Sequence, residues 1–440
     1  MSEVNQLIDQ QSESIYDLVS DGYAKYQMFV NNGKFIPGLD GLKTVYRRYL
    51  LSVKDSAKSS YEKSSLVLGN AMKWHPHETQ EDVLYSLVRW GLVQGQGNFG
   101  LRSHYRKLTG AAIRYTEVKY LNAVDSLLFK FENYFNYLDG ESGRKEPEFL
   151  ITPIPIALYR GSIGIGVGGV RTKIPAFSYE SILEAYQNND PTLLKSAYGL
   201  DIDYDNSTLN TLWTKGHGKV VLKFKVEKLP NGSTRIYGDC GAGVRPKLDQ
   251  LFKWEKQGLL KVSNDSTESM DLVFTRANNI RKISDKDIYQ EVLKASVIDD
   301  VRATYIIMFS HDGRAVKMGM KKWIDLTMGI YNKTFLKWKE MELKKLNRTL
   351  IRTKLIPVVG EMLRQGKSTA QIAKELNTPE TPVTKKTIAA IEGLPMRLLR
   401  KSDFSSTIKK IEDQIKSIES TVLDDLVQSG KMVDQLLNKY

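Results

Sequence analysis

Two seams of aliphatic side chains near the end of the sequence constrain its fold more than any other feature. The first lies in residues 319–356, where ten Lys/Arg against three Asp/Glu give a local charge of +7. The first seam consists of Leu336, Leu343, Leu346 and Leu350, and the second consists of Ile408, Ile411, Ile415, Ile418 and Val422. In both seams the residues recur at the spacing of helices that pack side by side. Residues 319–440 are therefore predicted to form a long antiparallel coiled coil with a globular tip. An ordinary two-helix bundle fits equally well, and Pro357 marks the end of the first helix or a kink in it.

The middle of the sequence alternates in the manner of half-buried strands. Such a pattern runs through Val220, Leu222, Phe224 and Val226. The turn at 230–232 leads into a second strand at 235–237, and 272–274 and 305–309 are predicted as further strands. We therefore predict a mixed α/β domain over residues 156–318.

The first 155 residues favour short helices. An amphipathic helical arm is predicted for residues 1–32, and further helices are predicted after residue 38, at 80–93 and at 103–130. Lys43, Arg47 and Arg48 share one side of the second of these helices. Short helices with a basic face are typical of helix-turn-helix or winged-helix domains, so residues 33–155 are predicted to be such a DNA-binding domain. The whole chain is thus expected to be an α+β multidomain protein.

Charge points to a polyanionic partner. The formal net charge is +13 and the isoelectric point is about 9.3. Positive charge is concentrated, because residues 83–116 contain no Asp or Glu but five Lys/Arg. Nucleic acid is therefore the first candidate.

Compartment and membrane signals are few. Cys240 is the only cysteine, so the chain forms no internal disulfide, which fits a reducing compartment. The polar N-terminus does not resemble a signal peptide, and no apolar run has the length of a membrane span. We expect a cytoplasmic protein without a membrane contact.

Three motifs are interpreted as misleading. Residues 164–169 contain a dinucleotide-like glycine pattern, but Pro175 stands where the following helix should run. Residues 360–368 resemble a phosphate-binding loop with one residue too many between the glycines. His75 and His77 have no nearby third ligand, so neither a metal site nor a cofactor site is predicted.

The pair Arg114-Tyr115 is the candidate for chemistry. A tyrosine hydroxyl beside a guanidinium, on a surface that attracts phosphate, is a plausible nucleophile for a DNA phosphodiester. A core or rim tyrosine is the more common alternative for such a residue taken alone.

Five motifs in order resemble the A-type subunit of type IIA DNA topoisomerases, the family of gyrase A, topoisomerase IV A and the bacteriophage medium subunit. They are Asp40-Gly-Leu-Lys43-x-Val-x-Arg47-Arg48, His75-Pro-His77, Gly95-Gln96-Gly-Asn98-Phe-Gly100, Ala111-Ala-x-Arg114-Tyr115-Thr-Glu-Val118 and Gly161-Ser-x-Gly-Ile165-x-Val-Gly168. The likeness covers residues 15 to 430, and Gly216-His-Gly-Lys219 looks like the entry to the family's tower domain.

The sequence also departs from the family pattern. Thr44 stands for the usual proline, Tyr46 for a His or Gln, and Glu78 for a glycine. No DNA-wrapping C-terminal domain follows the second seam, so relaxation or decatenation is expected rather than wrapping-driven supercoiling. The length resembles that of the bacteriophage subunit, which would place the chain in the host cytoplasm.

The resemblance implies a mechanism and roles for named residues. Tyr115 would form a transient 5′-phosphotyrosine bond in a staggered double-strand break, with Arg114 and His77 as its catalytic neighbours. Ile165 matches the family's intercalating isoleucine. The further DNA-binding residues would be Lys43, Arg47, Arg48, Lys73, His75, Gln96 and Asn98.

The resemblance also implies partners. Mg²⁺ and ATP are expected on a separate protein that carries the ATPase and metal-binding domains, and the chain itself would bind double-stranded DNA as a homodimer. The competing hypothesis is a non-catalytic winged-helix DNA-binding protein with a coiled-coil dimeriser.

Overall fold

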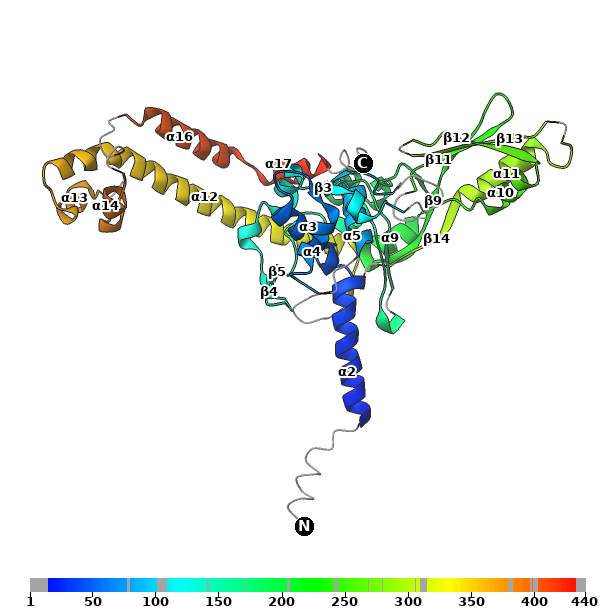
Figure 1. Cartoon of the computed structure of the whole chain (residues 1–440), viewed down its shortest axis with the longest axis horizontal. Helices are drawn as coiled ribbons and strands as arrows, with labels where there is room; N and C mark the ends of the chain where they lie inside the picture. The colour runs from blue at the N-terminus through cyan, green and yellow to red at the C-terminus, as the bar shows by residue number, and fades with distance from the viewer. Residues whose placement is uncertain are drawn as a thin grey trace, which may run out of the picture. The chain divides into compact units, whose positions relative to one another are not determined.

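The computed structural model has an α+β fold, as the sequence predicts (Figure 1). It describes residues 15–76, 80–100, 109–140, 142–169, 171–203, 206–240, 244–267, 269–278, 280–304, 306–308, 315–378, 383–395, 398 and 403–432. The chain divides into two compact units, one of residues 1–331 with 428–440 and one of residues 332–427. The predicted boundaries at 33, 156 and 319 remain predictions.

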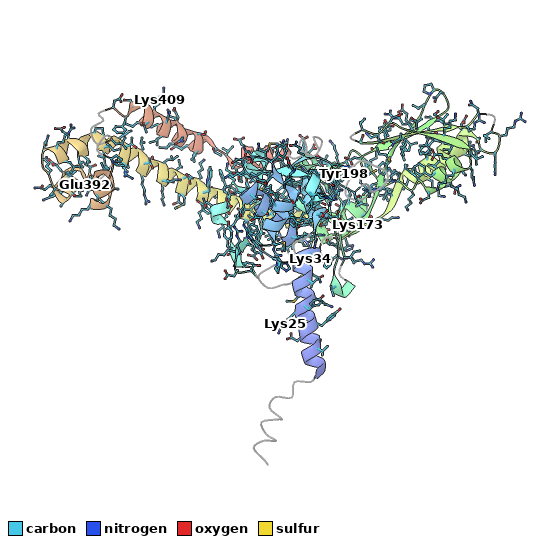
Figure 2. The ribbon with its side chains drawn as sticks, viewed as in Figure 1. Lys25, Lys34, Lys173, Tyr198, Glu392 and Lys409 are labelled. Atoms are coloured by element: carbon cyan, nitrogen blue, oxygen red, sulfur yellow. The ribbon has the colours of Figure 1, made fainter. Side chains whose placement is uncertain are left out.

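The N-terminal helix α2 (Ile15–Val30) continues into a π-helical turn, η1 (Asn31–Phe35). The sequence predicts a helix within residues 1–32, and the described part fits that prediction. The helical path passes through Asn31-Asn32-Gly33 and ends at Phe35, after which Ile36 adopts an extended backbone. Tyr23 and Tyr26 of α2 are more than half exposed, whereas Asn31 is 6% exposed (Figure 2 labels Lys25 and Lys34 in this segment).

Three helices and a small antiparallel sheet follow. The helices are α3 (Thr44–Ser56), α4 (Ser64–Ala71) and α5 (Glu81–Arg89). The sheet has the order β1-β3-β2, formed by Glu62–Lys63, Glu117–Lys119 and Gln94–Gln96. Buried Leu50, Val67 and Leu84 contribute to the core beneath these elements.

The predicted helix over 103–130 is wrong within its described part. That part contains the 3₁₀ turn η2 (Ile113–Tyr115), strand β3, the short α6 (Asn122–Val124) and the π-helical η3 (Asp125–Phe129). Burial alternates here, because Thr116, Val118 and Tyr120 are buried while Glu117 and Lys119 are half-exposed. Pairing of β3 with two neighbours therefore outweighs the helical pattern.

A connecting region leads to the second part of this unit. It contains η4 (Glu132–Tyr134), the hairpin β4 (Tyr137–Asp139) and β5 (Lys145–Pro147), and helix α7 (Ile156–Arg160). Every residue of α7 is buried.

A five-stranded antiparallel sheet carries the order β6-β7-β14-β9-β8. Its strands are Ser162–Ile165, Arg171–Ile174, Val297–Thr304, His217–Lys223 and Asp201–Asp203. Between its strands in sequence come η5 (Val167–Gly169), α8 (Tyr179–Asn188), η6 (Pro191–Leu193) and α9 (Asn206–Lys215), and α9 packs against β9.

A four-stranded antiparallel sheet has the order β10-β11-β13-β12. It is formed by Lys225–Lys228, Thr234–Gly238, Met270–Arg276 and Leu260–Asn264, and α10 (Asp249–Lys256) and α11 (Asp285–Ser296) pack against it. The single strand expected over 220–226 is divided at Phe224, because residues 217–223 pair with β14 and β8 whereas residues 225–228 pair with β11 in the other sheet. The predicted turn is confirmed, with Gly232 at φ +83°. A separate hairpin pairs β15 (Ile306–Met308) with β16 (Ala315–Lys317).

The long basic helix is confirmed as α12 (Met320–Arg364), and it runs on through Pro357. Helix α16 (Ser405–Ser420) lies antiparallel to it, because Lys339 donates to the carbonyls of Glu419 and Thr421 while Lys354 contacts Glu412 (Figure 1). Helices α13 (Thr369–Leu376) and α14 (Lys385–Glu392) close the far end over a buried core that includes Val359, Ile372, Ile388 and Ile391. The chain then continues through α17 (Leu423–Gln428) and η8 (Ser429–Lys431).

The two seams differ in burial. Ile411 and Ile415 are buried, but Leu336 is 59% exposed. An antiparallel helix pair is therefore what the structure contains, and the supercoil of a true coiled coil remains a prediction.

Candidate active site

The segment Asp40–Lys43 is a structural hub. The buried carboxylate of Asp40 accepts the backbone N–H groups of Leu42 at 2.9 Å and Leu150 at 2.8 Å. Gly41 has φ +82°, and a Cβ at this position would lie 2.4 Å from the nitrogen of Ala157. The motif is thus required to fasten α3 against α7, and its position sets where Lys43 emerges.

Arg47 points into this hub and not toward solvent. It is 2% exposed, and its Nε lies 2.9 Å from Asp40 Oδ2 while its Nη2 donates to the carbonyl of Leu42 at 3.2 Å. Direct contact with a DNA backbone, as expected from the sequence, does not fit this burial. The two-pronged guanidinium is engaged by the Asp40 segment instead.

Arg48 is likewise turned inward. Its Nε and Nη2 lie 2.7 and 2.9 Å from the two carboxylate oxygens of Glu146 on β5, and the residue is 7% exposed. The expectation that Arg48 holds a DNA backbone does not fit this pairing either. Arg48 joins α3 to the β4–β5 hairpin.

Lys43 is the member of this basic group that reaches the surface. Its Nζ donates to the carbonyl of Ile163 on β6 at 2.9 Å, at a partly exposed position just before α3. Burial, which removes water from around the ammonium group, lowers the pKa of Lys43 to about 8. The ammonium group therefore remains charged at neutral pH beside β6.

Tyr115 is presented on a rigid turn. It ends η2, its backbone N–H donates to the carbonyl of Ala112 at 2.9 Å, and the residue is 66% exposed. The guanidinium carbon of Arg114 lies 4.6 Å from the centre of the Tyr115 ring. The next residue, Thr116, is fully buried and its hydroxyl donates to Ser64 at 2.8 Å, so the turn is anchored directly behind the exposed phenol.

The glycine-rich loop supports this turn from below. The N–H of Ala111 donates to the carbonyl of Asn98 at 2.8 Å, and a Cβ on Gly97 (φ +107°) would lie 3.2 Å from the carbonyl oxygen of Tyr115. Gln96 pairs with Glu117 across the sheet, and Gln96 and Asn98 are both exposed. The structure therefore brings these two predicted DNA-binding residues next to Tyr115.

The histidine motif is only partly described. Lys73 is exposed after α4, whereas His75 is 7% exposed, which does not fit the expected direct contact between its imidazole and DNA. His77, the predicted third catalytic residue, lies outside the described residues. Trp74, between Lys73 and His75, is covered by Arg144, whose guanidinium carbon lies 4.2 Å from the centre of the Trp74 ring.

Ile165 stands at the exposed end of β6. It is 62% exposed and is therefore not a buried strand residue. A Cβ on Gly164 would lie 1.8 Å from the carbonyl oxygen of Phe35, which explains why glycine precedes the isoleucine.

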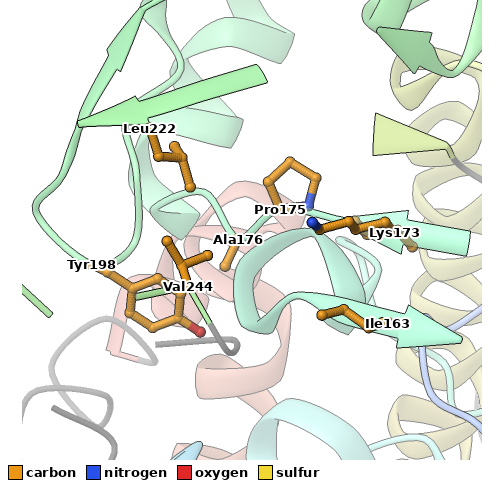
Figure 3. Close-up of a pocket in the computed structure, with 8 residues that line it drawn as sticks. Ile163, Lys173, Pro175, Ala176, Tyr198, Leu222 and Val244 are labelled. Atoms are coloured by element: carbon orange, nitrogen blue, oxygen red, sulfur yellow. The ribbon is translucent and has the colours of Figure 1, made fainter. Parts of the chain in front are cut away.

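A small hollow near β6 has an apolar lining. It is bordered by Ile163, Ala176, Tyr198 and Leu222, with Lys173 at its edge (Figure 3). We interpret it as loose packing between strands and not as a ligand site, because it offers few polar groups to fix a ligand.

Sequence reasoning missed three residues that shape this region. Asp40 lay inside a motif but was not assigned a role, and Glu146 and Asn31 carried no local signal. Glu146 meets Arg48 over 98 residues and Asn31 meets Val167 over 136. Only spatial proximity reveals these pairs.

Three further observations concern the described residues. Among them, no three His, Cys, Asp or Glu side chains gather in a way that could hold a metal ion. Glu117, the acid nearest to Tyr115 in sequence, forms an ion pair with Lys63 at 2.7 Å. Within the same part of the chain, no helix is long and apolar enough to cross a membrane.

Comparison with known proteins identifies the family. The DNA gyrase A protein of Thermotoga maritima is 25% identical over 91% of this chain and 55% of its own length, and that of Kosmotoga olearia is 28% identical over 68% and 38%. The DNA topoisomerase 4 A protein of Borreliella burgdorferi is 27% identical over 58% and 41%. The chain thus spans about half or less of the length of these relatives. The family model for the A-type subunit of DNA gyrase/topoisomerase IV matches residues 36–439, and the chain therefore belongs to this family.

Proposed function

We propose that this chain is the DNA breakage-reunion component of an ATP-dependent type IIA topoisomerase. The observation that carries the proposal is Tyr115, an exposed phenol on an anchored turn beside Arg114, in a chain of the gyrase A family. A nucleophile must be accessible and held in place, and this residue satisfies both conditions.

The proposed reaction exchanges one phosphodiester for another. The Tyr115 oxygen attacks a DNA phosphorus, an O–P bond to the 5′ end forms, and the bond to the 3′ oxygen breaks. The tyrosine proton leaves and the 3′ oxygen gains a proton, so religation is the reverse step and requires no added energy. Arg114 would stabilise the charge that develops on the phosphate oxygens, and His77 is retained as a second proposed catalytic neighbour.

DNA would be held by a smaller basic set than the sequence indicates. Lys43 and Lys73 reach the surface and would contact phosphates, which fix position but not sequence. Gln96 and Asn98 would contact the segment near the scissile phosphate. Arg47 and Arg48 are assigned a positioning role, and His75 a structural one, because all three are buried.

Ile165 would act as an apolar wedge between base steps. Its exposure at the end of a strand fits insertion into a bent duplex. Such a wedge would favour DNA sequences whose steps unstack at low energetic cost.

The finer architecture is part of the proposal. Helices α3–α5 with the sheet β1-β3-β2 have the composition of a winged-helix domain over residues 33–155. Residues 156–318 would be the tower, and residues 319–440 would form a coiled coil whose tip joins two copies into a homodimer. Two copies of Tyr115 would then produce a staggered double-strand break.

Mg²⁺ and ATP are proposed to bind to a B-type partner protein with the ATPase and metal-binding domains. The described residues around Tyr115 do not fit a magnesium site, because Glu117 is paired with Lys63 and no acidic cluster lies among them. We place the assembly in the cytoplasm, which is the host cytoplasm if the chain is phage-encoded.

Strand passage tests the proposal. Tyr115→Phe should abolish ATP-dependent relaxation of supercoiled plasmid by the complex with its partner, while plasmid binding changes less than about two-fold. Tyr137→Phe, at a 38% exposed tyrosine of the same unit, is the matched control and should relax normally. Full relaxation by the Tyr115→Phe complex would rule out Tyr115 as the nucleophile, whereas plasmid binding without relaxation by the parent complex would favour the competing architectural DNA-binding dimer.

A further inference from the structure

The side chain of Asn31 is bonded to one peptide unit far along the chain. Its Nδ2 donates to the carbonyl of Val167 at 3.1 Å, and its Oδ1 accepts the N–H of the same residue at 2.8 Å. Asn31 is 6% exposed, so both hydrogen bonds are largely shielded from water. An amide is the side chain that supplies a donor and an acceptor with this geometry.

These bonds fix the chain just after Ile165, and a second contact fixes it just before. Lys43 donates to the carbonyl of Ile163 at 2.9 Å, so residues two positions away on either side of Ile165 are held. The Ile165 side chain itself remains 62% exposed. The arrangement is a clamped backbone with a free apolar tip.

Glycines allow this close approach. A Cβ on Gly166 would lie 2.3 Å from Asn31 Oδ1, and a Cβ on Gly168, where φ is +81°, would lie 2.9 Å from the Gln27 amide. Gly166 has no positive φ, so its lack of a side chain serves the contact with Asn31 and not a backbone conformation. The glycine-isoleucine segment and η1 are thus shaped to each other.

We propose that Asn31 is a positioning residue for the Ile165 wedge, which makes the N-terminal segment a working part of DNA bending. The inference rests on the proposed function, because it presumes that Ile165 enters the duplex. Inserting the side chain requires free energy, because a base step must be unstacked. If the end of the strand were displaced by this load, less of the binding free energy would be available to bend the DNA. Asn31 would hold residue 167 in place while the tip is loaded.

DNA bending can be measured apart from cleavage. The full chain with Tyr115→Phe, mixed with its B-type partner, is added to a 40-base-pair duplex labelled at both ends for energy transfer, with 2-aminopurine at the bent step. Asn31→Ala should lower the bent-to-straight ratio by roughly ten-fold, the effect of losing about two net hydrogen bonds. Total DNA affinity should fall less than about three-fold, because phosphate contacts dominate it.

The clamp also predicts that the effects of Gly166→Ala and Asn31→Ala are not additive. Gly166→Ala alone should reduce bending, because its methyl group meets Asn31 Oδ1. In the Asn31→Ala background the same change should have little further effect. The two changes should therefore be non-additive, because both act on the same contact. Asn188→Ala, at an exposed asparagine of α8, is the control and should bend DNA normally.

Two outcomes separate this inference from the function beneath it. If Ile165→Ala bends DNA like the parent chain, the wedge role itself fails. If Ile165→Ala loses bending but Asn31→Ala retains it, or if Gly166→Ala is equally harmful with and without Asn31, the positioning role alone is overturned.

Discussion

Replacement of Arg47 by methionine tests whether this residue supports the protein or holds DNA. The change keeps an unbranched side chain but removes the guanidinium that pairs with Asp40 at 2.9 Å. Asp40 is fully buried and Arg47 is 2% exposed, so among the described residues the remaining carboxylate would keep its two backbone N–H partners, Leu42 and Leu150.

The loss should be large. Removing one partner of a buried ion pair destabilises a protein by about 3–5 kcal/mol, since the other charge stays buried without compensation. For a folded unit of this size, about 2 °C of Tm per kcal/mol gives a fall in Tm of about 6–10 °C. Scanning calorimetry measures it, and Asp40→Asn combined with Arg47→Met should lose less than the sum of the two single changes.

DNA binding supplies the opposite readout. Measured at a temperature well below the lowered Tm, the logarithmic salt slope for Arg47→Met should equal that of the parent chain. Lys43→Met is the comparison, because loss of one phosphate contact should reduce the slope by about 0.9 while Tm changes little. An Arg47→Met chain with normal Tm and a slope reduced by about one would refute the inward assignment.

Three further outcomes follow from the same geometry. Because burial lowers the pKa of Lys43 to about 8, this side chain loses its charge as pH rises through that value. The salt slope of DNA binding should therefore fall by about one between pH 7 and pH 9. Lys43→Arg should remove this pH dependence, and an unchanged slope in the parent chain would contradict the assignment. Gly41→Ala should lower Tm by several degrees, because φ is +82° at this position and the added Cβ would contact the nitrogen of Ala157. Gly22→Ala, in open space on α2, should not lower Tm. Equal Tm values for the two variants would rule out the contact. Arg114→Ala should reduce the rate of DNA cleavage by about 100-fold or more with DNA affinity nearly intact, as quenched-flow cleavage can measure, and a normal rate would remove Arg114 from the catalytic group.

The sequence foretold what depends on local pattern. The long basic helix, the turn at Gly232 and the α+β class follow from periodicity and turn chemistry, and the structure agrees with them. Tyr115 and Ile165 stand out by motif, and both prove to be exposed, although their roles remain predictions.

The sequence could not foretell what depends on distant partners. The sequence pattern of a basic helical face is the same whether Arg48 is exposed to solvent or forms an ion pair with Glu146, which is 98 residues away. The segment after Tyr115 resembles a helix in sequence, but it forms strand β3. Its pairing with β1 and β2 depends on distant residues and could not be predicted from the local pattern. The contact of Asn31 with Val167 gives no local signal, since the two residues are 136 positions apart in the chain.

The most direct test of the central claim is to trap the covalent intermediate. The chain and its B-type partner are mixed with supercoiled plasmid and Mg²⁺, quenched with detergent, digested with protease and examined by mass spectrometry of the DNA ends. The account predicts linear DNA whose 5′ ends carry a peptide joined through Tyr115, with free 3′ hydroxyls, and only when the partner is present. A peptide joined through any other residue, or DNA binding without an adduct beside an active partner, would contradict it.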